Sequence, residues 1–62
     1  MPAEAQAAIE KALTAIGCTV EVDDIEAEGD GYQAEEVQCQ DGEYDVTFDK
    51  GYGITSKEKE GY

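Results

Sequence analysis

The spacing of the apolar residues changes once along this chain, at Gly17, from the period of a helix to the period of a strand. Before Gly17 the apolar residues fall three or four positions apart, which places them on one stripe of an amphipathic helix. Pro2 suits the start of a helix, and a glycine commonly follows a helix end. We therefore predict a helix over about residues 3–16, with the stripe Ala5, Ala8, Ile9, Ala12, Leu13 and Ile16.

Beyond the helix, apolar and polar residues alternate, and glycine-containing turn motifs separate the runs. Segments 29–31 (Gly-Asp-Gly) and 41–42 (Asp-Gly) are turn motifs, and 51–53 (Gly-Tyr-Gly) interrupts the last run. The alternation slips at 23–24 and again at 35–36, which predicts a bulge or local twist where these strands pair. Strands are predicted over about residues 19–28, 32–40, 43–49 and 53–56, followed by a frayed tail over 57–62.

The Asp-Gly hairpin predicts how the second and third strands pair. It places Cys39 opposite Tyr44, and Val37 then lies opposite Val46. Because side chains alternate between the two faces of a strand, Tyr44, Val46 and Phe48 are predicted to face the helix. The side chains of the same strand that are predicted to face water are Asp45, Thr47 and Asp49.

These elements predict one α+β domain over residues 1–62. Its N-terminal helix packs on one face of a three- to four-stranded antiparallel meander, and the other face of the sheet is acidic. A chain of this length buries only about 60% of the surface that its unfolded form exposes, so its core needs further support.

Charge is the most extreme property of the composition, with sixteen acidic residues, four lysines, no arginine, no histidine and a net charge of −12. Nucleic acids and anionic membranes are excluded as partners, because both are bound through Lys and Arg. A surface that attracts cations or a basic protein, or that mimics a nucleic acid, remains open. So does an exterior whose charge only keeps the protein in solution.

The sequence contains no recognisable catalytic group, so we expect neither an enzyme nor a bound cofactor. Acid–base and nucleophilic catalysis need a positioned base, and histidine is absent. Ser56 is the only serine, and two cysteines without histidine cannot close a zinc site. Residues 24–35 match the spacing of an EF-hand loop, but glutamate stands at its third and fifth positions and strands are predicted on both sides. No metal site is therefore predicted.

Cys18 and Cys39 are predicted to form a disulfide. Cys18 begins the first predicted strand and Cys39 ends the second, and these ends adjoin in an antiparallel pair. Closing a loop of this length stabilises a small protein by about 3 kcal/mol, and such bridges persist in oxidising compartments. The alternative is that both are small buried thiols, since free cysteine is among the most buried residue types.

Nearly the whole chain resembles the PepSY or PepSY-like domain. The shared features are the alanine-rich helix, a strand entry on Asp-Gly-Tyr (30–32), the Asp-Gly-Glu-Tyr-Asp-Val strand (41–46), Asp49, and the Gly-Ile turn at 53–54. The 49–53 loop and both cysteines depart from the family pattern. The resemblance implies a non-catalytic, extracytoplasmic bacterial domain that restrains peptidases or binds ligands in the cell envelope.

The expected function is therefore a periplasmic or secreted binding module of PepSY type, with a peptidase or a basic protein surface as its partner. A removed signal peptide is expected, with Met1 added before a mature N-terminus. We expect a monomer or a weak dimer. Two alternatives are an acidic decoy that occupies a nucleic-acid- or basic-protein-binding site, and an acidic domain that stores cations.

Tyr32, Tyr44 and Tyr52 exceed what so small a core buries easily, so at least one of them is predicted to be largely exposed. Tyr52, on its glycine-flanked loop, is the expected one. Tyrosine is enriched at protein interfaces, although a ring that lies across the sheet with its hydroxyl in water is the simpler explanation. The candidate interaction surface comprises Tyr32, Tyr52, Asp45 and Asp49.

Overall fold

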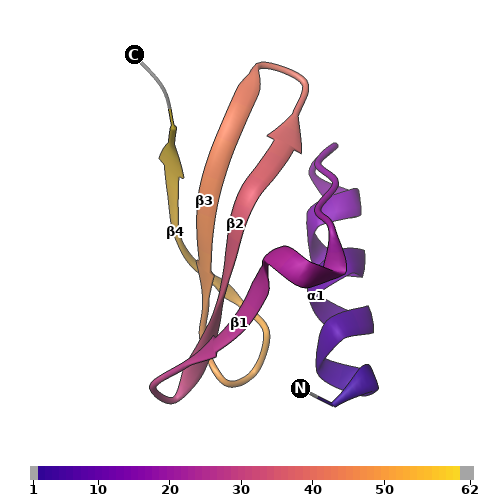
Figure 1. Cartoon of the computed structure of the whole chain (residues 1–62), viewed down its shortest axis with the longest axis vertical. Coiled ribbons are helices and arrows are strands. Elements are labelled where there is room, and N and C mark those ends of the chain that lie inside the picture. Colours follow the sequence, from indigo (N-terminus) through magenta and orange to yellow (C-terminus); the bar gives the residue numbers. More distant parts are fainter. Residues whose placement is uncertain (1, 61–62) are drawn as a thin grey trace.

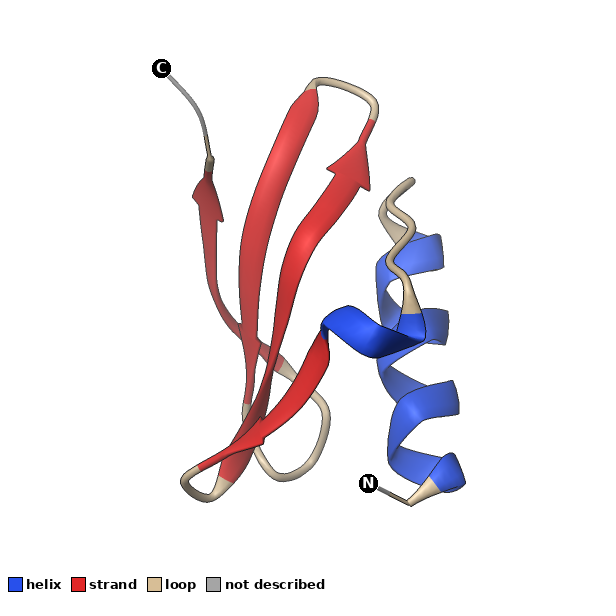
Figure 2. Ribbon diagram, in the orientation of Figure 1, coloured by secondary structure: helices blue, strands red, loops and turns tan. Residues whose placement is uncertain are grey.

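The computed structural model describes residues 2–60 and shows one helix packed against a four-stranded antiparallel sheet (Figures 1 and 2). The strands lie side by side in the order β1-β2-β3-β4, so the sheet is a simple meander. The predicted α+β fold class is confirmed. The elements are α1 (Ala3–Ala15), the 3-10 turn η1 (Val22–Asp24), β1 (Ile25–Glu28), β2 (Gly31–Cys39), β3 (Gly42–Phe48) and β4 (Ile54–Lys59).

Helix α1 ends where the glycine predicts and presents its predicted stripe to the sheet, except for Ile16, which lies beyond the last helical residue Ala15 and is exposed because the chain turns there. Ala5, Ile9 and Leu13 are spaced four residues apart and are fully buried. Gly17 has a φ of +79°, which a side chain rarely tolerates, and the Cys18 N–H donates to the Leu13 carbonyl at 2.8 Å. This combination is the Schellman motif, which satisfies a free carbonyl at the helix end and turns the chain back toward the sheet.

The first strand is shorter than the predicted range 19–28. Thr19 forms only an isolated bridge with Gln38, and the chain then leaves the sheet through η1 before β1 begins at Ile25. The prediction is therefore wrong for residues 20–24. The physical reason is the phase slip in the sequence, because the 3-10 turn resets the alternation so that Ile25 faces the core while Val22 stays exposed.

Strand β2 carries the second predicted irregularity, and this prediction is confirmed. The register between β2 and β3 shifts between Ala34 and Val37, and Glu36 in this bulge has a φ of +53°. The extra residue lets both Ala34 and Val37 point toward the core, where both are fully buried. The turn η1 lies opposite the bulge, so the two slips in the sequence are one local break in the β1–β2 pairing.

The hairpin between β2 and β3 is tighter than predicted. Cys39 pairs with Gly42 and Val37 pairs with Tyr44, so the turn residues are Gln40 and Asp41. The predicted pairs Cys39–Tyr44 and Val37–Val46 are therefore wrong by two positions. Gly42 uses its conformational freedom, with φ at +141°, as the first residue of β3 rather than inside the turn. A two-residue shift preserves the inward face, so Val46 and Phe48 are buried as predicted.

Strand β4 extends beyond the predicted end at residue 56. It runs to Lys59, and the Glu60 N–H donates to the Glu43 carbonyl at 2.7 Å, so residues 57–60 are not a frayed tail. Residues 61–62 of the predicted tail lie outside the described residues. Strand β3 offers a partner along this whole length, and the Lys57 ammonium lies 4.3 Å from the centre of the Tyr44 ring, a cation–π contact.

The core is a single layer between α1 and one face of the sheet. Side chains from α1, from Cys18 and from β1, β2 and β3 fill this layer, while β4 contributes no buried residue. The opposite face of the sheet is left uncovered by any described element (Figure 2). The core residues are Ala5, Ile9, Leu13, Cys18, Ile25, Ala34, Val37, Val46 and Phe48.

Candidate interaction surface

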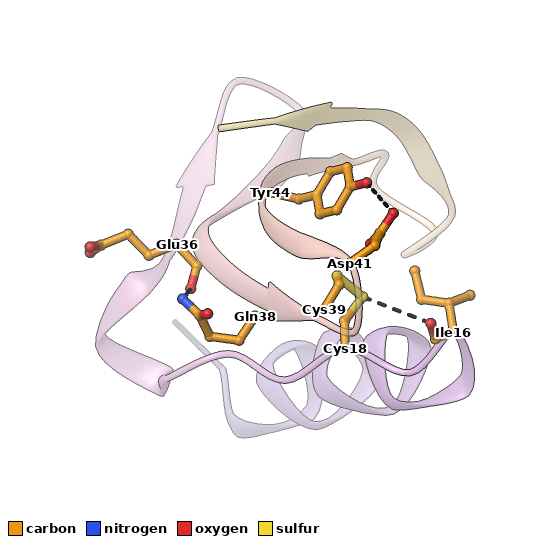
Figure 3. Close-up of a disulfide and its surroundings, with 7 residues drawn as sticks. All are labelled: Ile16, Cys18, Glu36, Gln38, Cys39, Asp41 and Tyr44. Atoms are coloured by element: carbon orange, nitrogen blue, oxygen red, sulfur yellow. Dashed lines mark hydrogen bonds between the residues drawn. A yellow bond between two sulfur atoms is a disulfide. The ribbon is translucent and has the colours of Figure 1, made fainter. Parts of the chain in front are cut away.

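Cys18 and Cys39 form the predicted disulfide, with their Cα atoms 4.1 Å apart (Figure 3). Cys18 lies three residues beyond the end of α1 and is buried, and Cys39 is the last residue of β2. The bridge therefore ties the end of the helix to the sheet beside the β2–β3 turn. Its role here is structural, because it joins the helix layer to the sheet. The neighbouring residues Thr19 and Gln38 continue this connection as an isolated β-bridge.

The β2–β3 turn is held by a hydrogen bond beside the disulfide. The Tyr44 hydroxyl donates to Asp41 Oδ2 at 2.8 Å (Figure 3). This bond lowers the pKa of Asp41 because it stabilises the carboxylate, and it raises the pKa of Tyr44 because an anionic phenolate would face that carboxylate. Both groups are therefore held in the states that make the bond at neutral pH.

The prediction of a largely exposed tyrosine is wrong. Tyr32, Tyr44 and Tyr52 are all half-buried, and each packs against the core. The rings of Tyr32 and Tyr52 stack in a tilted arrangement with their centres 5.6 Å apart. Partial burial raises the pKa of Tyr52, with smaller contributions from a hydrogen bond with Tyr32 and from the charge of Glu4. Tyr52 therefore folds back over the core near the start of α1.

Asp49 explains why the Tyr52 loop folds back. Its Oδ1 accepts hydrogen bonds from the N–H groups of Gly51 at 2.8 Å and Gly53 at 2.9 Å. The Tyr52 N–H donates to the Asp49 carbonyl at 3.0 Å, and Tyr52 takes a φ of +69°. The carboxylate thus satisfies the backbone of a tight loop and sets the direction of the Tyr52 ring.

Replacing Asp49 by alanine is expected to lower the free energy of unfolding by about 1–2 kcal/mol, because two hydrogen bonds to a charged acceptor are lost. Asp49→Asn keeps an oxygen at the same place and should lose less. Urea unfolding of the two variants beside the natural protein measures the difference. An Asp49→Ala variant as stable as the natural protein would show that the carboxylate does not hold the loop.

The uncovered face of the sheet is strongly acidic, as predicted. Val46 and Phe48 of β3 are buried, so alternation turns Glu43 and Asp45 toward the other face. Asp45 pairs with Glu58 of β4, which places their side chains on the same side of the sheet. The side chains of Lys57 and Lys59, the two lysines of β4, point to the helix side of the sheet, because these residues pair with Val46 and Tyr44. We call the following residues the acidic face: Glu26, Glu35, Glu43, Asp45, Glu58 and Glu60.

The carboxylates of the acidic face repel one another, and this repulsion contributes to the raised pKa values of Glu35 and Glu60. A hydrogen bond with Glu26 and the charge of Glu26 raise the pKa of Glu35, and the charge of Asp45 adds to the shift. Partial desolvation raises the pKa of Glu60, followed by the charges of Asp45 and Glu43. Asp45 lies between these groups, and its buried Oδ1 accepts no hydrogen bond from the ionised side chains of the described residues. The face therefore destabilises the folded protein at neutral pH.

Lowering the pH from 7 toward 4.5 is expected to raise the melting temperature. The folded protein binds protons at Glu35 and Glu60 more tightly than the unfolded chain does, because both pKa values are raised above the ordinary value of 4.5. Stability therefore rises as the pH falls through these raised values. The lowered pKa of Asp41 acts in the opposite sense. Its stabilising contribution is present above the ordinary value of 3.8 and is lost as the pH falls through the lowered one.

Melting curves across this pH range should therefore pass through a maximum on the acidic side of neutrality. The double variant Glu35→Gln/Glu60→Gln should flatten the rise between pH 7 and 4.5, since the titrating groups are gone. A melting temperature that falls continuously from pH 7 downward would contradict the assigned repulsion.

The break in the β1–β2 pairing leaves a small pocket on another part of the surface. Its volume is about 310 Å³, and the ionisable side chains that line it are all carboxylates. Within residues 2–60, no three histidine, cysteine or carboxylate side chains are grouped closely enough to hold a metal ion. The pocket is lined by Thr19, Val20, Glu21, Asp24, Glu36 and Gln38.

The four residues of the predicted interaction surface do not lie together. Asp45 belongs to the acidic face, Tyr32 and Tyr52 pack on the helix side, and Asp49 holds its own loop. Glu35 and Glu60 were not among the predicted site residues. Strand alternation would have predicted that both side chains face outward, but only if the position of the β2 bulge and the length of β4 had been known.

Comparisons with protein-family models, with curated proteins and with solved structures give no match. No helix within residues 2–60 has both the length and the apolar character required to cross a bilayer. The small α+β fold and its disulfide are therefore the established framework, and the acidic face is its most distinctive surface.

Proposed function

We propose that this protein is a non-catalytic binding module, located in the periplasm or secreted, whose acidic face binds a positively charged protein surface. The observation that carries the proposal is the position of Asp45. Its buried Oδ1 lacks a donor, and it lies close enough to Glu35 and Glu60 to raise the pKa values of both. A partner that supplies Lys or Arg side chains would remove this repulsion on binding.

The disulfide supports a location outside the cytoplasm, because structural disulfides form and persist in oxidising compartments. The disulfide also weighs against the alternative of a decoy, because the nucleic-acid-binding proteins that a decoy would bind work mainly in the reducing cytoplasm. The resemblance to the PepSY domain adds a class of partner, a peptidase of the cell envelope that the module restrains.

The test is binding to a panel of extracytoplasmic peptidases with basic surfaces, measured by biolayer interferometry. The variant Glu35→Gln/Glu60→Gln removes two charges from the acidic face, and we expect binding to weaken about 10-fold, equivalent to about 1.4 kcal/mol. The control Glu10→Gln/Asp23→Asn removes the same charge from α1 and η1. It should bind almost as the natural protein does.

Two outcomes would overturn the proposal. Equal weakening by both variants would show that only the total charge matters. A complete absence of binding across the panel, together with capture of nucleic-acid-binding proteins, would favour the decoy.

A further inference from the structure

We infer that the free edge of β4 accepts an extended basic segment of the partner as a fifth strand. The inference rests on the proposed function and specifies the form in which the partner binds. Strand β4 is the last strand of the sheet, all six of its residues are exposed, and no described residue pairs with its outer edge. The other edge strand, β1, has only four residues and begins directly at η1.

The outward backbone groups of β4 follow from the ladder that it forms with β3. The Glu60 N–H donates inward to the Glu43 carbonyl, and Asp45 pairs with Glu58 in the same phase. Because inward and outward groups alternate along an antiparallel strand, the N–H and C=O groups of Lys57 and Lys59 point to the free edge. Two donors and two acceptors are thus spaced for an added strand.

The charges beside this edge select a basic segment. Glu58 of β4 and Glu60, the residue after β4, project onto the acidic face, which continues into Asp45 and Glu43 on the neighbouring strand. In an antiparallel addition, the residues of the new strand opposite Glu58 and Glu60 lie on that same face. Lys or Arg at every second position of the incoming segment would therefore meet carboxylates.

A second copy of the chain is a poor occupant of this edge. Twofold antiparallel pairing of two β4 strands places the same faces together, so Glu58 and Glu60 of one copy would lie beside Glu58 and Glu60 of the other. Like charges directly opposite each other destabilise a strand pair, and natural edge strands use such charges to prevent self-association. Charge repulsion therefore disfavours pairing of this edge with a second copy, whereas a basic strand is complementary to it.

The probe for the experiment is a short peptide of alternating lysine and threonine. With its lysines opposite Glu58 and Glu60, its threonines lie opposite Lys57 and Lys59 and supply the hydrogen-bonding backbone groups. Hydrogen exchange followed by NMR should show the Lys57 and Lys59 amides protected at least about 10-fold by the peptide. The Ser56 and Glu58 amides face β3 and should change little.

Two modified peptides separate strand addition from simple charge attraction. Methylation of the threonine backbone nitrogens removes the donors that face β4 and should abolish binding. Methylation of the lysine backbone nitrogens, which face away, should preserve it. On the protein side, Lys57→Pro removes an outward donor and should weaken binding at least about 10-fold more than Lys57→Gln, which removes only the charge.

Protection of the Lys57 and Lys59 amides in the natural protein decides the matter even if the proline variant fails to fold. Peptide binding without this protection, or equal binding of both methylated peptides, would overturn strand addition while leaving charge attraction by the acidic face in place. Peptidase binding without any binding of the peptide would likewise overturn the edge and keep the proposed function. Failure of both the peptide and the peptidase panel would overturn both.

Discussion

Loss of the Cys18–Cys39 disulfide is expected to lower the free energy of unfolding by about 3 kcal/mol, because the bridge closes a loop with a sequence separation of 21 residues. For a domain of this size that corresponds to a fall in melting temperature of more than about 10 °C. The effect is large because the core is one thin layer, with nine buried hydrophobic residues within 2–60. The bridge also sits where the chain leaves α1, so its loss frees the helix end from β2.

Two routes to the reduced state provide the measurement and its control. Reduction of the natural protein with dithiothreitol changes no side-chain volume in the core, whereas Cys18→Ala/Cys39→Ala also removes both sulfurs. Both forms should melt well below the oxidised protein, and the double variant should be the less stable of the two. A reduced natural protein that melts within about 3 °C of the oxidised one would show that the bridge contributes little.

Replacing Gly31 by alanine is expected to destabilise the fold by about 2–3 kcal/mol. A Cβ atom at this first position of β2 would collide with the carbonyl oxygen of Phe48, and it would also lie 3.2 Å from the Asp49 Cα. These are backbone atoms of a paired strand, so they cannot move aside without disturbing the Tyr32–Phe48 pair. The glycine is thus required by close approach of two backbones.

Gly51→Ala is the matched control for this substitution. A Cβ at Gly51 would meet only a carboxylate oxygen of Asp49, at 3.4 Å, and its φ lies outside the region that favours glycine. We expect a change within about 0.5 kcal/mol, as for ordinary surface substitutions. Chemical unfolding of both variants measures the contrast, and equal stability of the two alanine variants would contradict the assigned collision.

The change of apolar period at Gly17 was sufficient to predict the helix, the meander and the inward face of β3. The register of the hairpin was not, because an Asp-Gly pair fits either inside a turn or at its exit, and here Gly42 begins β3. The length of β4 was missed because its six residues are all exposed. Its stability comes from pairing with β3 and from the Lys57–Tyr44 contact, and neither leaves a periodic trace in the sequence.

The candidate site was predictable in outline and wrong in detail. Alternation indicated an acidic face opposite the helix, and the structure has one. The tyrosines were placed incorrectly because the direction of Tyr52 depends on hydrogen bonds from Gly51 and Gly53 to Asp49, which no period reveals. Glu35 lies on the acidic face because the β2 bulge, which shifts the register between Ala34 and Val37, follows it. Glu60 lies on this face because pairing with β3 continues beyond Lys59.

The central claim is that the acidic face is retained for binding although it destabilises the folded protein. Thermal melting of Asp45→Asn, alone and with the lysine–threonine peptide at a fixed concentration, tests both halves of this claim. The amide removes the central charge and can donate to neighbouring carboxylates. We therefore expect a higher melting temperature than the natural protein without peptide, and a smaller rise on adding peptide. A lower melting temperature alone, or a peptide-induced rise as large as that of the natural protein, would contradict the claim.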